Sequence, residues 1–281
     1  MLNMVRAELY RMAHARMTWA FLIVIAAPTA LSAVAAAVVL GDAGLVSFLE
    51  STSSDVSRVL DASTGQAPVL SLYGSSFVNG SFVAMAACCY VALFATKGVG
   101  DGKRAALAKN LVQSQGGRMA YTIAQIAVAA VAGALFVAVG IVSCALFYGL
   151  AGFAVLPGSP AEFALWAVQV WCAVFAYEAV TLVLALATGS EAAAVVLGLF
   201  LGGFAVEGAV SMAVGALAYA LGPLPWLEGA ASFIADWSLM AQLQLLGHGE
   251  MCGAGLYAVA GAVVAVAAAA SIAVMRRRSL G

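Results

Sequence analysis

The chain has 281 residues, of which 64% are hydrophobic and only 9% are charged, and its formal net charge is −1. A soluble domain carries about 25% charged residues, and no soluble packing could cover so much apolar surface. The composition therefore excludes an ordinary water-soluble protein and predicts a chain that lies in a lipid bilayer.

Residues 1–16 are predicted to form a helix that lies in the membrane interface. Four apolar side chains recur at helical spacing on one face, namely Leu2, Val5, Leu9 and Met12. Arg11 and His14 fall on the opposite face, so the cations would meet anionic headgroups. A frayed cytoplasmic tail is the alternative. A cleaved signal peptide is not expected, because the following apolar run, 19–40, exceeds the roughly 7–15 residues of such segments.

Six apolar segments are each long enough to cross a bilayer, which takes roughly 20 residues. They lie at about 17–40, 71–96, 119–150, 161–187, 192–220 and 253–275. The third and fifth exceed the required length, so we expect them to be tilted or broken. Pro28 lies inside the first segment, where a proline can kink a helix.

Cations are distributed very unevenly along the chain. Eleven of the twelve Lys and Arg residues form three clusters, which are Arg6, Arg11 and Arg16; Lys97, Lys103, Arg104, Lys109 and Arg118; and Arg276, Arg277 and Arg278. With six spans all three clusters lie on one side, which the positive-inside rule makes cytoplasmic. The predicted fold is therefore all-α, with six transmembrane helices and both termini in the cytoplasm. The outer connections carry acidic residues and, as a cation, only Arg58.

The connection 97–118 contains the stretch GVGDGKR, which looks like a phosphate-binding loop. The P-loop pattern is G-x-x-x-x-G-K-[ST]. Aligned on Gly102 and Lys103, this chain has Lys97 where the first glycine is needed and Arg104 where a hydroxyl is needed. Nucleotide binding by this chain is therefore not expected.

The same connection instead predicts a short cytoplasmic helix over 102–115. Asp101 can cap its start, and Gly116 and Gly117 suit a helix C-terminus in the left-handed conformation. The cations in its first turn oppose the helix dipole, so we expect lipid headgroups or an acidic partner surface to favour them. A solvated connector without a partner is the alternative.

Two other connections have distinct character. The four residues TGSE around Ser190 can only join neighbouring antiparallel spans. In 221–250, Pro223 and Pro225 break the preceding helix, and apolar residues then recur at helical spacing, which predicts short amphipathic helices at the outer interface.

The five cysteines and two histidines lack metal-ligand spacing, so no metal site is expected.

Two carboxylates fall inside predicted spans. Glu178 lies about ten residues from the inner end of the fourth span, and Glu207 lies nearer the outer side of the fifth. Carboxylates in a membrane are costly and are candidates for function, so this pair could relay protons or bind a cationic substrate. The alternative is that each is protonated or bonded to a neighbouring helix. Tyr177 and Thr181 are candidate local partners of Glu178.

Other polar and small residues in the spans predict helix contacts. Asn79, Gln125 and Gln169 could line a pathway, but we expect them to join helices by hydrogen bonds. Gly198 and Gly202 have the G-x-x-x-G spacing, which favours close approach of another helix, a second copy of the chain being one candidate.

These features together resemble the membrane-spanning subunits of ABC-2 type ABC transporters. The opening VRAELYRMAHARMTWAFLIV is similar to their interfacial helix that leads into span one, and GKRAALAKNLVQSQGGRMAYTIAQ is similar to their loop between spans two and three. In this loop Lys109, Asn110 and Arg118 match the family pattern, whereas Gly117 stands where members often have Ser. The nearest similarity is to the small permeases of lantibiotic immunity exporters.

This resemblance implies a permease subunit of an exporter in the bacterial cytoplasmic membrane. Two such subunits, identical or homologous, would form the pathway, and each would rest on a separate ABC ATP-binding subunit that holds ATP and Mg²⁺. The chain itself would be no enzyme, would hold no cofactor and would bind no nucleic acid. The coupling residues would be Lys103, Arg104, Lys109, Asn110 and Arg118, and the candidates for the pathway or for helix contacts are Glu178, Glu207 and Asn79.

Three other classes of protein are alternatives for a chain of this composition. A proton-coupled secondary transporter that uses Glu178 and Glu207 would be expected to contain inverted repeats or paired broken helices, which the sequence does not indicate. A membrane-embedded hydrolase would need a nucleophile with its base, or a motif such as HExxH, and His14 and His248 lie outside the spans. A membrane anchor or sensor subunit is the remaining alternative.

Overall fold

The computed structural model describes residues 2–41, 67–68, 77–100, 115–151, 155–156, 159–221, 226, 229, 232–234, 237–247 and 251–277, and these are almost entirely helical, as predicted. The longer helices are α2 (Arg16–Gly41), α6 (Phe77–Gly100), α8 (Gln115–Leu150), α9 (Pro160–Thr188), α10 (Glu191–Gly202), α11 (Ala205–Leu221) and α14 (Gly255–Arg277). Two shorter helices are α1 (Leu2–His14) and α13 (Leu239–Gly247). The two-residue strands β1 (Ala67–Pro68) and β2 (Val155–Leu156) pair in parallel.

Four helices are long and apolar enough to cross a bilayer, and these are α2, α8, α9 and α14. The bent pair of α10 and α11 makes a fifth candidate if it counts as one span. The apolar stretch that α6 contributes, Phe82–Thr96, is shorter. The chain is thus a helical membrane protein with four or five candidate spans, and helices occupy the positions of all six predicted segments.

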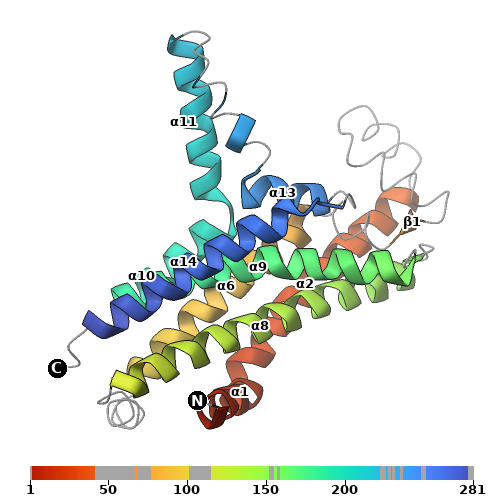
Figure 1. The fold of residues 1–281 in the computed structure, drawn as a ribbon. Helices are drawn as coiled ribbons and strands as arrows, with labels where there is room; N and C mark the ends of the chain where they lie inside the picture. The colour runs from red at the N-terminus through yellow and green to blue at the C-terminus, as the bar shows by residue number, and fades with distance from the viewer. Residues whose placement is uncertain are drawn as a thin grey trace.

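Helix α9 lies at the centre of the bundle and packs against α6, α8, α10 and α14 (Figure 1). It ends at Gly189, whose φ of 64° is the left-handed conformation that glycine adopts at helix C-termini. The Ser190 side chain then accepts a hydrogen bond from the Ala193 N–H at 3.4 Å and caps α10. The predicted tight connection between neighbouring antiparallel helices is therefore confirmed.

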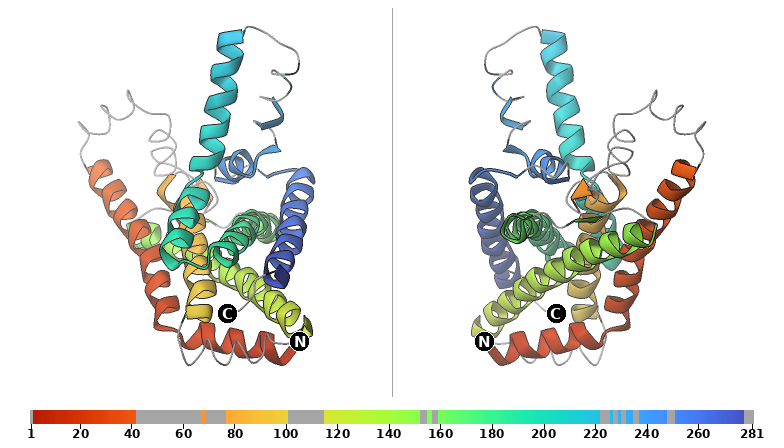
Figure 2. Two further views of the ribbon diagram at one scale, coloured as in Figure 1. Left: turned by 90° about the vertical axis from the view of Figure 1, so that its left-hand side faces the viewer. Right: turned by 90° about the vertical axis from the view of Figure 1, so that its right-hand side faces the viewer.

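The fifth predicted segment is broken at Gly203 and Phe204, and α10 and α11 meet at an angle of 55°. Phe204 has a φ of 59°, a left-handed conformation that costs a bulky residue about 1–3 kcal/mol. Its ring packs against Tyr177 of α9 with centroids 5.4 Å apart, which holds the break in place. Figures 1 and 2 show α11 pointing away from the other helices.

Helices α6 and α10 lie unusually close because two glycines of α10 face α6. A Cβ atom on Gly202 would lie 2.5 Å from the Met85 Cα, and one on Gly198 would lie 3.2 Å from the Cys88 carbonyl carbon. The predicted close approach is confirmed, but its partner is a helix of the same chain. The hypothesis of a dimer contact at this glycine pair is therefore wrong.

The boundaries of the helices beside the 97–118 connection differ from the prediction. Helix α6 continues through Gly100, and α8 begins at Gln115. Gly116 and Gly117 therefore start a long helix and do not end a short one, because the hydrogen bonding of α8 extends toward its N-terminus and glycine readily adopts helical φ. Residues 101–114, which include most of the predicted short helix, lie outside the described residues.

The described arginines gather at one end of the bundle. Arg118 at the start of α8 donates from Nη1 to the carbonyl oxygens of Met275 and Arg276 at the end of α14, at 3.5 and 3.2 Å. Arg11 of α1 donates from Nη2 to the Phe94 carbonyl, near the end of α6, at 3.5 Å. Helix α1 lies across this end (Figure 2). The described arginines of the three clusters thus lie at one end of the bundle, and that this end faces the cytoplasm stays a prediction.

Candidate functional site

The residues predicted from the sequence fall into three groups. Four coupling residues lie outside the described residues, and these are Lys103, Arg104, Lys109 and Asn110. Asn79 lies in the first turn of α6, and the structure does not describe its side chain. Arg118 joins α8 to α14. Glu178 is buried within α9, and Glu207 is partly buried and bonded to Tyr177.

Glu178 is completely buried in the middle of α9, with 0% of its surface exposed. Within the described part of the chain, neither carboxyl oxygen has a hydrogen-bond partner. The side chain lies against Gly133 of α8, since a Cβ atom there would be 2.5 Å from Oε2. A side chain at this position would force the Glu178 carboxyl group to move.

The predicted local partners of Glu178 have other bonds. The Thr181 hydroxyl donates to the Tyr177 carbonyl at 2.9 Å, and the Tyr177 hydroxyl donates to Glu207 at 2.7 Å. The prediction that these two residues satisfy Glu178 is therefore wrong. Thr181 lies one turn along the helix but bonds its own backbone, as hydroxyls in helices often do. The Cys88 thiol of α6 lies beside both Thr181 and Glu178.

Glu207 joins three helices by accepting two short hydrogen bonds. Oε1 accepts from the Tyr177 hydroxyl of α9 at 2.7 Å, and Oε2 accepts from the Met240 backbone N–H at 2.7 Å. Met240 is in the first turn of α13, where backbone N–H groups lack helical partners and favour a negative group. Of the two interpretations of Glu207, the structure bears out the bond to neighbouring helices.

Gln169 also joins helices, as expected. It is 2% exposed, and its amide makes two bonds to the backbone of one residue. Nε2 donates to the Cys252 carbonyl at 2.7 Å, and Oε1 accepts from the Cys252 N–H at 3.1 Å. Trp166, about one turn earlier on α9, donates from Nε1 to the Leu246 carbonyl near the end of α13 at 2.9 Å. The segment that leads into α14 is thus held against α9.

A polar cluster beneath α1 escaped the sequence analysis. Glu8 and Arg11 form an ion pair with 2.7 Å between Oε2 and Nη2, and the Arg11 guanidinium lies 4.0 Å from the centroid of the Phe94 ring. Gln125 and Tyr121 of α8 are buried beside this pair. The spacing Glu-x-x-Arg, which places both side chains on one helix face, is the signal that could have revealed it.

Glu8 makes the attachment of α1 sensitive to pH. Burial raises the pKa of Glu8 above its ordinary value of 4.5, against the opposing effects of Arg11 and Gln125. Because the pKa is raised on folding, the contribution of Glu8 to stability is fully present below the ordinary value and is lost as pH rises through the folded-state pKa. We expect a nitroxide at exposed Ala13 to become more mobile over this pH range, and Glu8→Gln to remove the dependence. Equal pH dependence in both proteins would contradict this.

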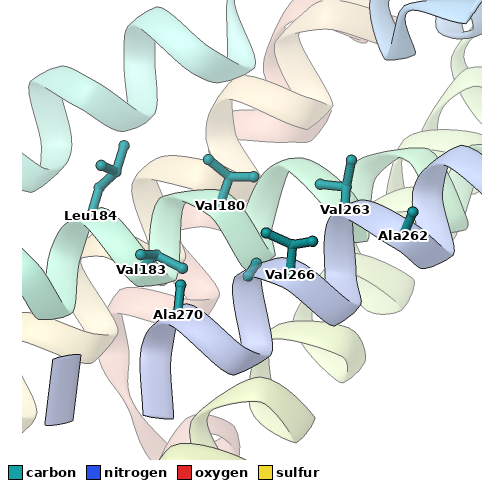
Figure 3. Close-up of a pocket in the computed structure, with 8 residues that line it drawn as sticks. Val180, Val183, Leu184, Ala262, Val263, Val266 and Ala270 are labelled. Atoms are coloured by element: carbon teal, nitrogen blue, oxygen red, sulfur yellow. The ribbon is translucent and has the colours of Figure 1, made fainter. Parts of the chain in front are cut away.

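Two grooves on the described surface are lined almost entirely by apolar side chains. One of about 390 Å³ lies between α9 and α14 and is lined by Val180, Val183, Leu184, Ala262, Val263, Val266, Ala267 and Ala270 (Figure 3). Such a surface suits lipid acyl chains and offers a polar ligand no hydrogen bond. Among the described residues, no three His, Cys, Asp or Glu side chains are placed to hold a metal ion.

No known family model matches the chain, and no curated protein matches it significantly.

Proposed function

We propose that this chain is the transmembrane permease subunit of an ATP-driven exporter of the ABC-2 type. In this proposal six helices cross a bacterial cytoplasmic membrane, α1 lies in the inner interface, and both termini are inside. The observation that carries it is the contact of Arg118, the last residue of the predicted coupling loop, with the end of α14. A permease subunit that is driven by another protein needs a contact that transmits motion from its coupling loop to its membrane-spanning helices.

The packing of the helices offers a route by which motion of the coupling loop would reach α10 and α14. A force on 97–118 would act on the end of α6 and the start of α8, and Arg118 would pass it to α14. Helix α6 would carry it to α10 through the close contact at Gly202, because backbones in contact cannot slide without moving together. The break at Phe204 would then let α10 move while Glu207 holds α11.

The proposed partners follow from the same resemblance. A separate ABC ATP-binding subunit would bind ATP and Mg²⁺ beneath the coupling loop. A second permease subunit, identical or homologous, would complete the pathway across the bilayer. The lipid bilayer would cover the many exposed apolar side chains of α2, α8 and α14.

Assembly with the ATP-binding subunit tests the proposal. We expect co-expression with a cognate ABC ATP-binding subunit to give a stable complex. Replacing Lys109 and Arg118 with Ala should weaken the complex several-fold, because charged contacts with the partner and the link to α14 are lost together. Arg118→Lys is the control that keeps the charge. Unchanged assembly and ATPase coupling in the double variant would contradict the coupling role.

A proton-coupled secondary transporter is the second candidate, with Glu178 and Glu207 as the carriers. It is favoured by the break between α10 and α11, since discontinuous helices form the sites of many such transporters. Two findings weigh against it: the described residues contain one such break instead of a pair, and both oxygens of Glu207 are already bonded. Proton movement into vesicles that contain this chain without any ATPase would favour the second candidate.

A further inference from the structure

We infer that Glu178 is a proton-binding site, which holds its proton where α6, α8 and α9 meet and exchanges it only when α8 moves away at Gly133. This inference does not rest on the proposed function, because it concerns the described conformation of this chain alone. It assigns the two intramembrane glutamates different roles. Glu207 fastens helices, whereas Glu178 binds an ion.

The first step is that an ionised Glu178 would have nothing to stabilise it. Its carboxyl group is fully buried, and within the described residues no donor reaches either oxygen. Burying a carboxylate without a partner is one of the most unfavourable events in a protein interior. Neutralising the group by a proton removes this cost without any rearrangement.

The second step is that no described charge or titratable group takes the place of the proton. Helix α6 contributes Cys88 and Tyr90, and neither is a cation. On α8 the neighbour is Gly133. The charged or titratable groups of that helix are about three to four turns from it, and these are Arg118, Tyr121, Cys144 and Tyr148.

The remaining helices packed against α9 also place no charged group beside Glu178. The charged residue of α10 is Glu191, at the first position of that helix, and the cations of α14 are in its last turn. Helix α13 carries no titratable side chain. On α9 itself, the Tyr177 hydroxyl is bonded to Glu207. Within the described part of the chain, a proton is thus the only available source of neutrality.

The third step excludes a metal cation as the ligand. Sodium and calcium ions require several oxygen ligands around them, and a single carboxyl group beside a thiol does not supply this set. A bare proton needs neither additional ligands nor volume.

The fourth step identifies where exchange occurs. Gly133 is the point at which α8 covers the carboxyl group with backbone alone. A small separation of α8 from α9 there would expose Oε2 before any other part of the side chain. Water could then take the proton, so the protonation of Glu178 depends on whether α8 and α9 are together or apart.

Infrared spectroscopy of the purified full chain in lipid nanodiscs tests this directly. The probe is the proton itself, detected as the carbonyl band of a protonated carboxylic acid at neutral pH. A Glu8→Gln background removes the other acid that burial favours in the neutral form. We expect the band in this background, its loss in Glu178→Gln, and no change in Glu191→Gln, an exposed control at the start of α10. Absence of the band, or its persistence in Glu178→Gln, would overturn the inference.

Two additions keep the test decisive. If Glu178→Gln does not fold, as judged by circular dichroism, a pH titration of the band in the folded Glu8→Gln background still decides whether a buried acid is protonated. Gly133→Ala, which forces the carboxyl group away from α8, should speed exchange of the band into D₂O at least several-fold. Unchanged exchange would show that Gly133 does not control access. No ATPase is present, so these results do not depend on whether the chain is a permease subunit.

Discussion

Replacing Gly202 with alanine is expected to destabilise the bundle by about 1–3 kcal/mol, the usual cost of overpacking a tight contact. The new Cβ atom would lie 2.5 Å from the Met85 Cα and 2.8 Å from the Ala84 carbonyl oxygen. Both atoms belong to the backbone of α6, so no side-chain rotation can relieve the clash and α10 must move away. Thermal unfolding in detergent would measure the loss.

Gly208 and Gly215 of α11 provide matched controls for this variant. A Cβ atom at either position would meet nothing within 4 Å. Alanine there should be neutral or stabilise α11 by up to about 1 kcal/mol, because alanine has the higher helix propensity. Similar destabilisation at Gly202 and at the control positions would contradict the close packing of α10 on α6.

Replacing Glu207 with alanine is expected to have the second largest effect, about 2 kcal/mol, because it removes two short hydrogen bonds at once. The Met240 N–H would lose its acceptor, and the start of α13 should fray. Glu207→Gln keeps one acceptor oxygen and should lose less, and Tyr177→Phe removes a single bond and should lose least. Hydrogen exchange of the α13 backbone measures the order of the three variants.

Glu162 offers a control for this series. Like Glu207, it is an acid in the first turn of its helix, but Glu162 is exposed to solvent. Glu162→Ala should leave the exchange of α13 unchanged. Unaltered protection of α13 in Glu207→Ala would show that the carboxylate does not hold this helix.

Much of the helical framework was predictable because the bilayer fixes the length of an apolar span. Hydropathy alone placed helices at all six segments, and the excess length of the fifth indicated the break that occurs at Phe204. The tight turn at Ser190 was also predictable from local chemistry. Gly189 adopts the left-handed conformation that ends α9, and the Ser190 hydroxyl caps the start of α10. Gln169 was predicted to hold neighbouring segments together by hydrogen bonds, and it bonds the backbone of Cys252.

The pairing of helices was not predictable from one sequence, since it depends on contacts between distant segments. The spacing of Gly198 and Gly202 indicated a close neighbour but not that α6 would supply it. For the same reason Gly133 gave no sign that it makes room for Glu178. Glycines also misled at Gly116, because glycine favours the position after a helix C-terminus but here lies in the first turn of α8. Four of the coupling residues lie outside the described residues, so their role stays a prediction.

The central claim is that this chain is moved by a separate ATPase. The most direct measurement is the rate of ATP hydrolysis by a cognate ABC ATP-binding subunit, in nanodiscs with and without this chain. We predict that the chain changes the rate several-fold and that Arg118→Ala reverses most of the change while Arg118→Lys does not. An identical rate with and without the chain would contradict the claim.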